Sequence, residues 1–77
     1  MHLPKGIADT TLETICNFLE NDMENEYTSE EIADKVNLSR VTVKRYMNYL
    51  LENGKINGRM NYETGGRPSM LYKWNMK

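Results

Sequence analysis

A cluster of basic and hydrogen-bonding side chains between positions 40 and 48 is the part of this sequence best suited to chemistry. Arg and Lys donate hydrogen bonds to guanine edges or to phosphate oxygens, Asn can pair with adenine through two bonds, and a valine or threonine methyl can contact thymine. This combination predicts contact with a nucleic acid, and an ordinary solvated basic face is the alternative. At helical spacing, the outward positions are Arg40, Val41, Lys44, Arg45 and Asn48.

Side chains for catalysis or metal binding are scarce. His2 and Cys16 are the only Cys or His side chains, too few for a zinc site. Cys16 falls within an apolar stripe, which favours a small core residue over a reactive thiol. The carboxylates Glu30, Glu31 and Asp34 are better explained as a solvated helix face than as catalytic groups. We therefore expect neither enzyme activity nor a metal or cofactor; a small hydrolytic or metal enzyme is a weak alternative.

Charge divides the chain into two halves. Residues 1–34 hold nine acids and one base, a balance of −8, and residues 35–77 hold nine bases and two acids, a balance of +7. The net charge of −1 hides this division. A basic face presented to a polyanion, with an acidic face turned away, accounts for the pattern.

Length and composition indicate one soluble domain over residues 1–77. The chain is 39% hydrophobic and 27% charged, which is typical of globular proteins. No apolar run approaches the roughly 20 residues of a membrane span, and no secretory leader opens the sequence. A single cysteine fits a reducing compartment. We expect a cytoplasmic location and no membrane contact.

A first helix is predicted from about Thr10 to Asn21, because apolar residues recur there at the helical period. Thr10 and Glu13 have the spacing of a capping box, in which each side chain meets a free backbone N–H. The acid-rich residues 21–26 then predict a loop. The apolar stripe consists of Leu12, Ile15, Cys16 and Leu19, with Met23 as an extension.

A short second helix and a tight turn should follow. Thr28 can cap this helix with Glu31 completing a capping box, and the helix should end near Val36. Asn37 tolerates the left-handed conformation that a turn requires, and Ser39 can cap a third helix. The buried face of the second helix should be Ile32, Ala33 and Val36.

The third helix is predicted from Ser39 to about Asn53, where Gly54 can adopt a left-handed cap. Tyr46 stands at the border of its apolar stripe, so packing is its expected role. Two helices joined by so short a turn, the second far more basic, predict a helix-turn-helix over about residues 28–53. The stripe consists of Val43, Met47, Leu50 and Leu51.

After Gly54 the apolar period changes to two, which indicates strands. A first strand with Ile56, Gly58, Met60 and Tyr62 on its buried face, a turn at residues 64–68, and a returning strand with Met70, Tyr72 and Trp74 predict a hairpin wing over about residues 55–75. Tyr72 and Trp74 should close the sheet over the first helix. The fold class is therefore α+β, a winged helix-turn-helix with three helices followed by a two-stranded β-hairpin.

Double-stranded DNA is the expected partner. The third helix should enter the major groove, the second should cross the backbone above it, and Arg67 at the wing tip should reach a minor groove or a phosphate. A lone module of this size should bind one half-site weakly, which favours a homodimer on DNA. A winged helix that contacts protein instead is the main alternative. The predicted DNA-binding residues are Thr28, Ser39, Arg40, Val41, Thr42, Lys44, Arg45, Asn48, Arg59 and Arg67.

Four segments, residues 3–7, 27–33, 38–47 and 65–68, are spread over nearly the whole chain and carry a family resemblance. Through Ser39-Arg40-x-Thr42-x-x-Arg45-Tyr46 and Gly66-Arg67-Pro68, the chain resembles the C-terminal effector domain of bacterial two-component response regulators of the citrate/malate family. Asn37 departs from the glycine commoner there.

The resemblance implies that the chain is part of a longer protein. Such a protein would carry an N-terminal receiver domain with a phospho-accepting aspartate, and a membrane sensor histidine kinase would act upstream. Its genes would serve the uptake and use of citrate, malate or other C4-dicarboxylates. The residues that the resemblance places against DNA are Ser39, Arg40, Thr42, Lys44, Arg45 and Arg67.

Overall fold

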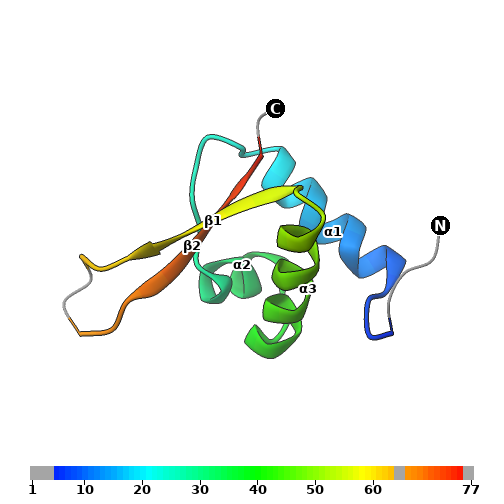
Figure 1. Ribbon diagram of the computed structural model, residues 1–77. Helices are drawn as coiled ribbons and strands as arrows, with labels where there is room; N and C mark the ends of the chain where they lie inside the picture. Colours follow the sequence, from blue (N-terminus) through cyan, green and yellow to red (C-terminus); the bar gives the residue numbers. More distant parts are fainter. Residues whose placement is uncertain (1–4, 64–65, 76–77) are drawn as a thin grey trace.

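The structure is a computed structural model that describes residues 5–63 and 66–75. Within these ranges three helices precede an antiparallel hairpin, and the hairpin extends to one side of the helices (Figure 1). This confirms the predicted winged helix-turn-helix. Residues 64 and 65 of the predicted turn lie outside the described part of the chain. The elements are α1 Asp9–Glu20, α2 Ser29–Val36, α3 Arg40–Glu52, β1 Ile56–Asn61 and β2 Ser69–Trp74.

Helix α1 begins one residue earlier than predicted, and its predicted capping box is wrong. Ala8 occupies the N-cap position and makes no side-chain cap bond. Thr10 therefore lies inside the helix, where its carbonyl accepts a hydrogen bond of 3.0 Å from the Thr14 hydroxyl. The predicted stripe does face the core: Ile15 and Leu19 are buried, and the half-buried Leu12 and Cys16 pack against them. Burial raises the pKa of the Cys16 thiol, and Glu20 adds to the effect, as expected for a packed cysteine.

Helix α2 has the predicted capping box. Thr28 Oγ1 accepts a hydrogen bond from the Glu31 N–H at 3.1 Å, and Glu31 Oε1 accepts one from the Thr28 N–H at 2.9 Å. The helix ends at Val36, as predicted, and its C-cap Asn37 has a left-handed φ of 59° and ψ of 49°, also as predicted. The N–H of Leu38 then bonds the Ala33 carbonyl at 3.0 Å. These local bonds set the angle at which α3 leaves the turn.

The core lies between the three helices and the base of the hairpin. Ile32 and Ala33 of α2 pack there with four residues of α3, and the predicted Val36 is only half-buried. Tyr46 is fully in the core, and Leu51, which was expected there, is only half-buried. The four buried residues of α3 are Val43, Tyr46, Met47 and Leu50.

The hairpin pairs Ile56 with Trp74 at its base and Asn61 with Ser69 at its outer end. The prediction of a half-buried β1 is wrong beyond Ile56, and Tyr62 just after the strand is 74% exposed. The reason is geometric: β1 runs past the helices, so only the base of the hairpin has a layer to pack on (Figure 1).

Strand β2 supplies the hairpin's contribution to the core. Tyr72 is buried, Trp74 packs against the core, and β2 contacts α1 as predicted. The backbone of Tyr72 also exchanges hydrogen bonds of 2.8 and 2.9 Å with Tyr27 in the loop between α1 and α2. This pairing fastens the base of the hairpin to that loop.

Candidate nucleic-acid interface

The outward face of α3 carries side chains that can donate hydrogen bonds to an external partner. At 3.6 residues per turn, Val41, Arg45 and Asn48 fall on the side of the helix opposite the buried residues. All three are exposed, and Val41 stands out as an apolar side chain that is 73% exposed. An exposed valine beside an arginine and an asparagine matches a surface that reads base edges, where the valine can meet a thymine methyl.

The start of α3 is fixed by its own hydroxyl groups. Ser39 Oγ accepts a hydrogen bond from the Thr42 N–H at 3.1 Å and donates one to Thr42 Oγ1 at 2.8 Å. This cap was predicted for Ser39, and the hydroxyl of Thr28 plays the same part for α2. Thr28, Ser39 and Thr42, all predicted to contact DNA, therefore also form the hydrogen bonds that cap the starts of α2 and α3.

The first turns of α2 and α3 share one surface. A shallow depression there is lined by Ser29, Arg40, Val41 and Lys44. Nη1 of Arg40 lies 3.3 Å from Oε2 of Glu30, and the two side chains are 69% and 68% exposed. A single contact between such exposed charges contributes little to stability, so Arg40 can exchange this carboxylate for another anion.

Arg45 runs along the segment that precedes α1. A Cβ placed on Gly6 would stand 3.3 Å from Cδ of Arg45 and 3.7 Å from its Nε. The arginine side chain therefore crosses the backbone of Gly6 at close range while remaining exposed.

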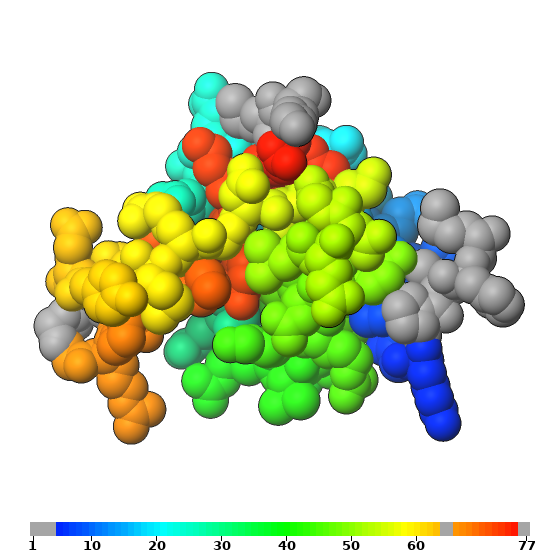
Figure 2. Space-filling model, in the orientation of Figure 1, coloured from blue at the N-terminus to red at the C-terminus, as the bar shows by residue number. Residues whose placement is uncertain are grey.

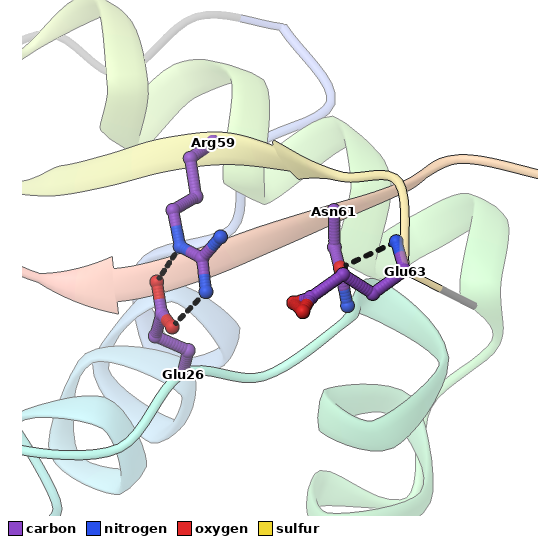
Figure 3. A network of polar contacts seen from close by, with 4 residues as sticks. All are labelled: Glu26, Arg59, Asn61 and Glu63. Atoms are coloured by element: carbon purple, nitrogen blue, oxygen red, sulfur yellow. Dashed lines mark hydrogen bonds and ion pairs between the residues drawn. The ribbon is translucent and has the colours of Figure 1, made fainter.

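Arg59 on β1 forms an ion pair with Glu26 in the loop between α1 and α2, although its side chain is 57% exposed. Its Nε and Nη2 donate to the Glu26 carboxylate at 2.6 and 2.8 Å (Figure 3). The hydrogen bond from Arg59 lowers the pKa of Glu26, and the same bond raises the pKa of Arg59. The two residues are 33 positions apart, so no local pattern marked Glu26 as the partner.

The hairpin tip and the start of α3 lie on one side of the molecule. Gly66 and Arg67 at the tip are exposed, and Figure 2 shows the orange tip segment and the green start of α3 both protruding at the lower edge of the view. The predicted contact residues thus come from two separated places, the α2–α3 surface and the tip, that face the same way.

Other kinds of site find no support in the described ranges 5–63 and 66–75. They hold no group of three or more His, Cys, Asp or Glu side chains placed to bind a metal. No helix in this part of the chain is long and apolar enough to cross a membrane.

Residues 11–65 match the family described as HTH domain. The chain belongs to the HTH domain family. Its relatives confirm the predicted likeness to bacterial response regulators: two are named as C4-dicarboxylate response regulators DctR, and others are named as the transcriptional regulatory proteins DcuR, CitT and MalR. The transcriptional regulatory protein DcuR of Escherichia coli K12 is 32% identical over 71 residues, which are 92% of this chain and 30% of DcuR. The probable C4-dicarboxylate response regulator DctR of Halalkalibacterium halodurans is 41% identical over 71 residues, with the same shares of 92% and 30%.

This HTH domain chain spans about 30% of the length of these curated relatives. Among solved structures, a candidate transcriptional regulator from Methanosarcina mazei Go1 superimposes with a TM-score of 0.82 at 17% identity, covering 92% of this chain and 58% of that one. ZitR of Lactococcus lactis, solved in complex with DNA, superimposes with a TM-score of 0.60 at 24% identity, covering 97% and 51%. At such identities the likeness establishes the winged-helix fold.

Proposed function

We propose that this chain binds double-stranded DNA sequence-specifically and serves transcriptional regulation. The observation that carries the proposal is the exposed face of α3, where Val41, Arg45 and Asn48 share the outward side of a helix whose opposite side is buried. Helix α3 would enter the major groove, α2 would cross the backbone, and the hairpin tip would reach the flanking minor groove. The HTH family match and the regulator names of the relatives support this assignment.

The finer proposal is that the chain is the effector domain of a two-component response regulator. A receiver domain would precede it in the full protein, and a sensor histidine kinase would phosphorylate that receiver. Relatives named for C4-dicarboxylate control support a role in the genes of such acids. We also propose pairing of two copies on DNA, since one small module reads only a half-site, and a cytoplasmic location beside the chromosome.

The test is to substitute one arginine from each place. Arg45→Ala and Arg67→Ala should each weaken binding to a duplex selected by the wild-type chain from random sequence. Each loss should be about 1–3 kcal/mol if the side chain reads a base, and smaller for a phosphate contact. Circular dichroism should show both variants folded. If about six phosphates are neutralised, log affinity should fall with log salt at a slope of roughly −5.

Two results would count against the proposal. Unchanged affinity of both arginine variants at matched salt would reject the assigned face. The protein-contact alternative would be favoured by a second pair of results. In that case the wild-type chain would select no duplex from random sequence, and it would bind a protein partner even in an excess of unrelated duplex DNA.

A further inference from the structure

The short turn from Lys5 to Ala8 is tied to α3 instead of hanging free. Ile7 is buried in the core. The N–H of Ala8 donates a hydrogen bond of 2.8 Å to the hydroxyl of Tyr46, 38 positions away. The hydroxyl of the buried Tyr46 therefore accepts a hydrogen bond from the turn, and Tyr46 holds the turn in position against α3.

Gly6 gives the turn its shape. Its φ of +90° is a conformation that residues with a Cβ rarely adopt. A Cβ on Gly6 would also crowd the Arg45 side chain, because it would stand 3.3 Å from Cδ of Arg45. The arginine of α3 therefore lies against the backbone of Gly6, and Lys5 is the residue that immediately precedes this contact.

The result is a pair of cations without an internal counter-ion. In residues 5–63 and 66–75, neither Lys5 nor Arg45 forms an ion pair, and both are exposed. The acid nearest in sequence, Asp9, lines a separate groove between α1 and the C-terminal half of α3. Two exposed cations carried by segments that touch at Gly6 favour an external anion.

The segment that carries Lys5, at the start of the described chain, lies on the other side of α3 from the wing (Figure 2). In Figure 2 the dark-blue start of the described chain protrudes at the lower right, the orange hairpin tip at the lower left, and the green start of α3 between them. All three protrude toward the same edge. A partner that lies along this edge would meet α3 at its centre and a basic segment at each end.

We propose that Lys5 and Arg45 form a second DNA-backbone clamp on the flank opposite the wing. The inference rests on the proposed function and extends it. Lys5 supplies a point charge to a phosphate oxygen. Of the two roles open to Arg45, base edge or phosphate, the clamp assigns it the phosphate, to which it supplies a planar fork. The wing and the clamp would then hold the DNA backbone on both sides of the groove that α3 occupies, which fixes the register of the helix.

Lys5→Gln tests the clamp, with Lys55→Gln as the matched control. Lys55 is also exposed and loses the same charge, but it lines the groove between α1 and α3 beside Trp74. The probe is a selected duplex of about 30 base pairs, roughly three helical turns. Lys5→Gln should reduce the magnitude of the salt slope by about 0.9 and weaken binding several-fold at low salt, and Lys55→Gln should leave both nearly unchanged.

Phosphate ethylation interference locates the loss. For wild type, interference should appear on both flanks of the bound site. Arg67→Ala should lose it on the wing flank and Lys5→Gln on the opposite flank. Equal slopes for wild type and Lys5→Gln, or a lower slope with the interference pattern unchanged, would overturn the clamp while leaving the α3 assignment intact. Failure of the wild-type chain to bind any duplex would instead reject the proposed function.

Gly6→Ala gives a second test that removes no charge. The added methyl would stand 3.3 Å from Cδ of Arg45 on a residue with positive φ, so the turn or the arginine side chain must shift relative to the other. A folded Gly6→Ala variant should bind the same duplex more weakly than wild type and lose the same flank of interference as Lys5→Gln. A folded variant with wild-type interference on both flanks would contradict the clamp.

Discussion

The helix-turn-helix and the hairpin hold their arginines in different ways. In the helix-turn-helix, Arg40 meets Glu30 through one contact of 3.3 Å between side chains that are more than two-thirds exposed. On the hairpin, Arg59 gives two nitrogens to Glu26 at 2.6 and 2.8 Å. A bidentate pair fixes geometry, and a single exposed pair does so weakly. Two acids of the N-terminal half therefore act differently. Glu26 holds the hairpin through Arg59, and the weaker contact of Glu30 leaves Arg40 able to bind another anion.

The two regions also differ in how they are packed. The helix-turn-helix buries Ile32, Val43 and Met47 completely. The hairpin contributes Ile56 and Tyr72 at its base and is exposed along the rest of β1. The packed helices present α3 on a rigid body, and the wing projects from this body and is fixed only at its base. This arrangement suits a partner that contacts α3 at one place and the wing tip at another.

The packing difference should appear most strongly in the stability of two truncations. Ile32→Ala removes a fully buried side chain and should reduce the free energy of unfolding by about 2–5 kcal/mol. Tyr62→Ala removes a larger side chain that is 74% exposed, and should change it by less than about 0.5 kcal/mol. Urea denaturation followed by circular dichroism measures both. Comparable losses in the two variants would mean that the wing packs against something in solution.

The turn between α2 and α3 should show a smaller effect, governed by backbone conformation. Asn37 has a φ of 59°. Asn37→Ala should destabilise the chain by about 1 kcal/mol, because alanine tolerates this conformation less well. Asn37→Gly should lie within about 0.5 kcal/mol of wild type, since relief in the folded state offsets the greater freedom of the unfolded chain. Thermal unfolding of the pair measures the difference, and equal stability of the Ala and Gly variants would contradict the left-handed turn.

The features that could be predicted from the sequence are those set by neighbouring residues. The capping box of Thr28 and Glu31 spans three positions, the left-handed turn is one residue, and the stripe of α3 recurs every three or four. Each is decided by bonds within one or two turns of helix. The outward face of α3 could be predicted for the same reason, because helical spacing alone decides which side chains share a face. The contacts of that face with DNA remain a prediction.

The features that could not be predicted depend on distant contacts. The start of α1 follows from the left-handed Gly6 and the bond between Ala8 and Tyr46, so a plausible local cap at Thr10 gave the wrong boundary. The exposure of β1 depends on where the helical layer ends, which alternation within the strand cannot reveal. Arg59, predicted to contact DNA, is bonded in the structure to Glu26, 33 positions away.

The smallest expected effect is the contribution of this last pair, and it should depend on pH. Arg59 lowers the pKa of Glu26 in the folded chain, below the value of about 4.3 typical of an unfolded glutamate. The pair therefore stabilises the fold above about pH 4.3, and its contribution is lost as pH falls through the lower folded-state pKa. Glu26→Gln lacks this contribution at every pH.

The stability of wild type should thus exceed that of Glu26→Gln near neutral pH, and the gap should narrow as the pH falls below about 4.3. Urea midpoints measured across this range test it. Glu30→Gln is the matched control, because it removes the same charge from the single, exposed contact with Arg40 and should produce a smaller gap. If the gap for Glu26→Gln stays constant with pH, or is no larger than that for Glu30→Gln, the hairpin is not fastened by Arg59. That arginine would then be available to DNA, as the sequence had predicted.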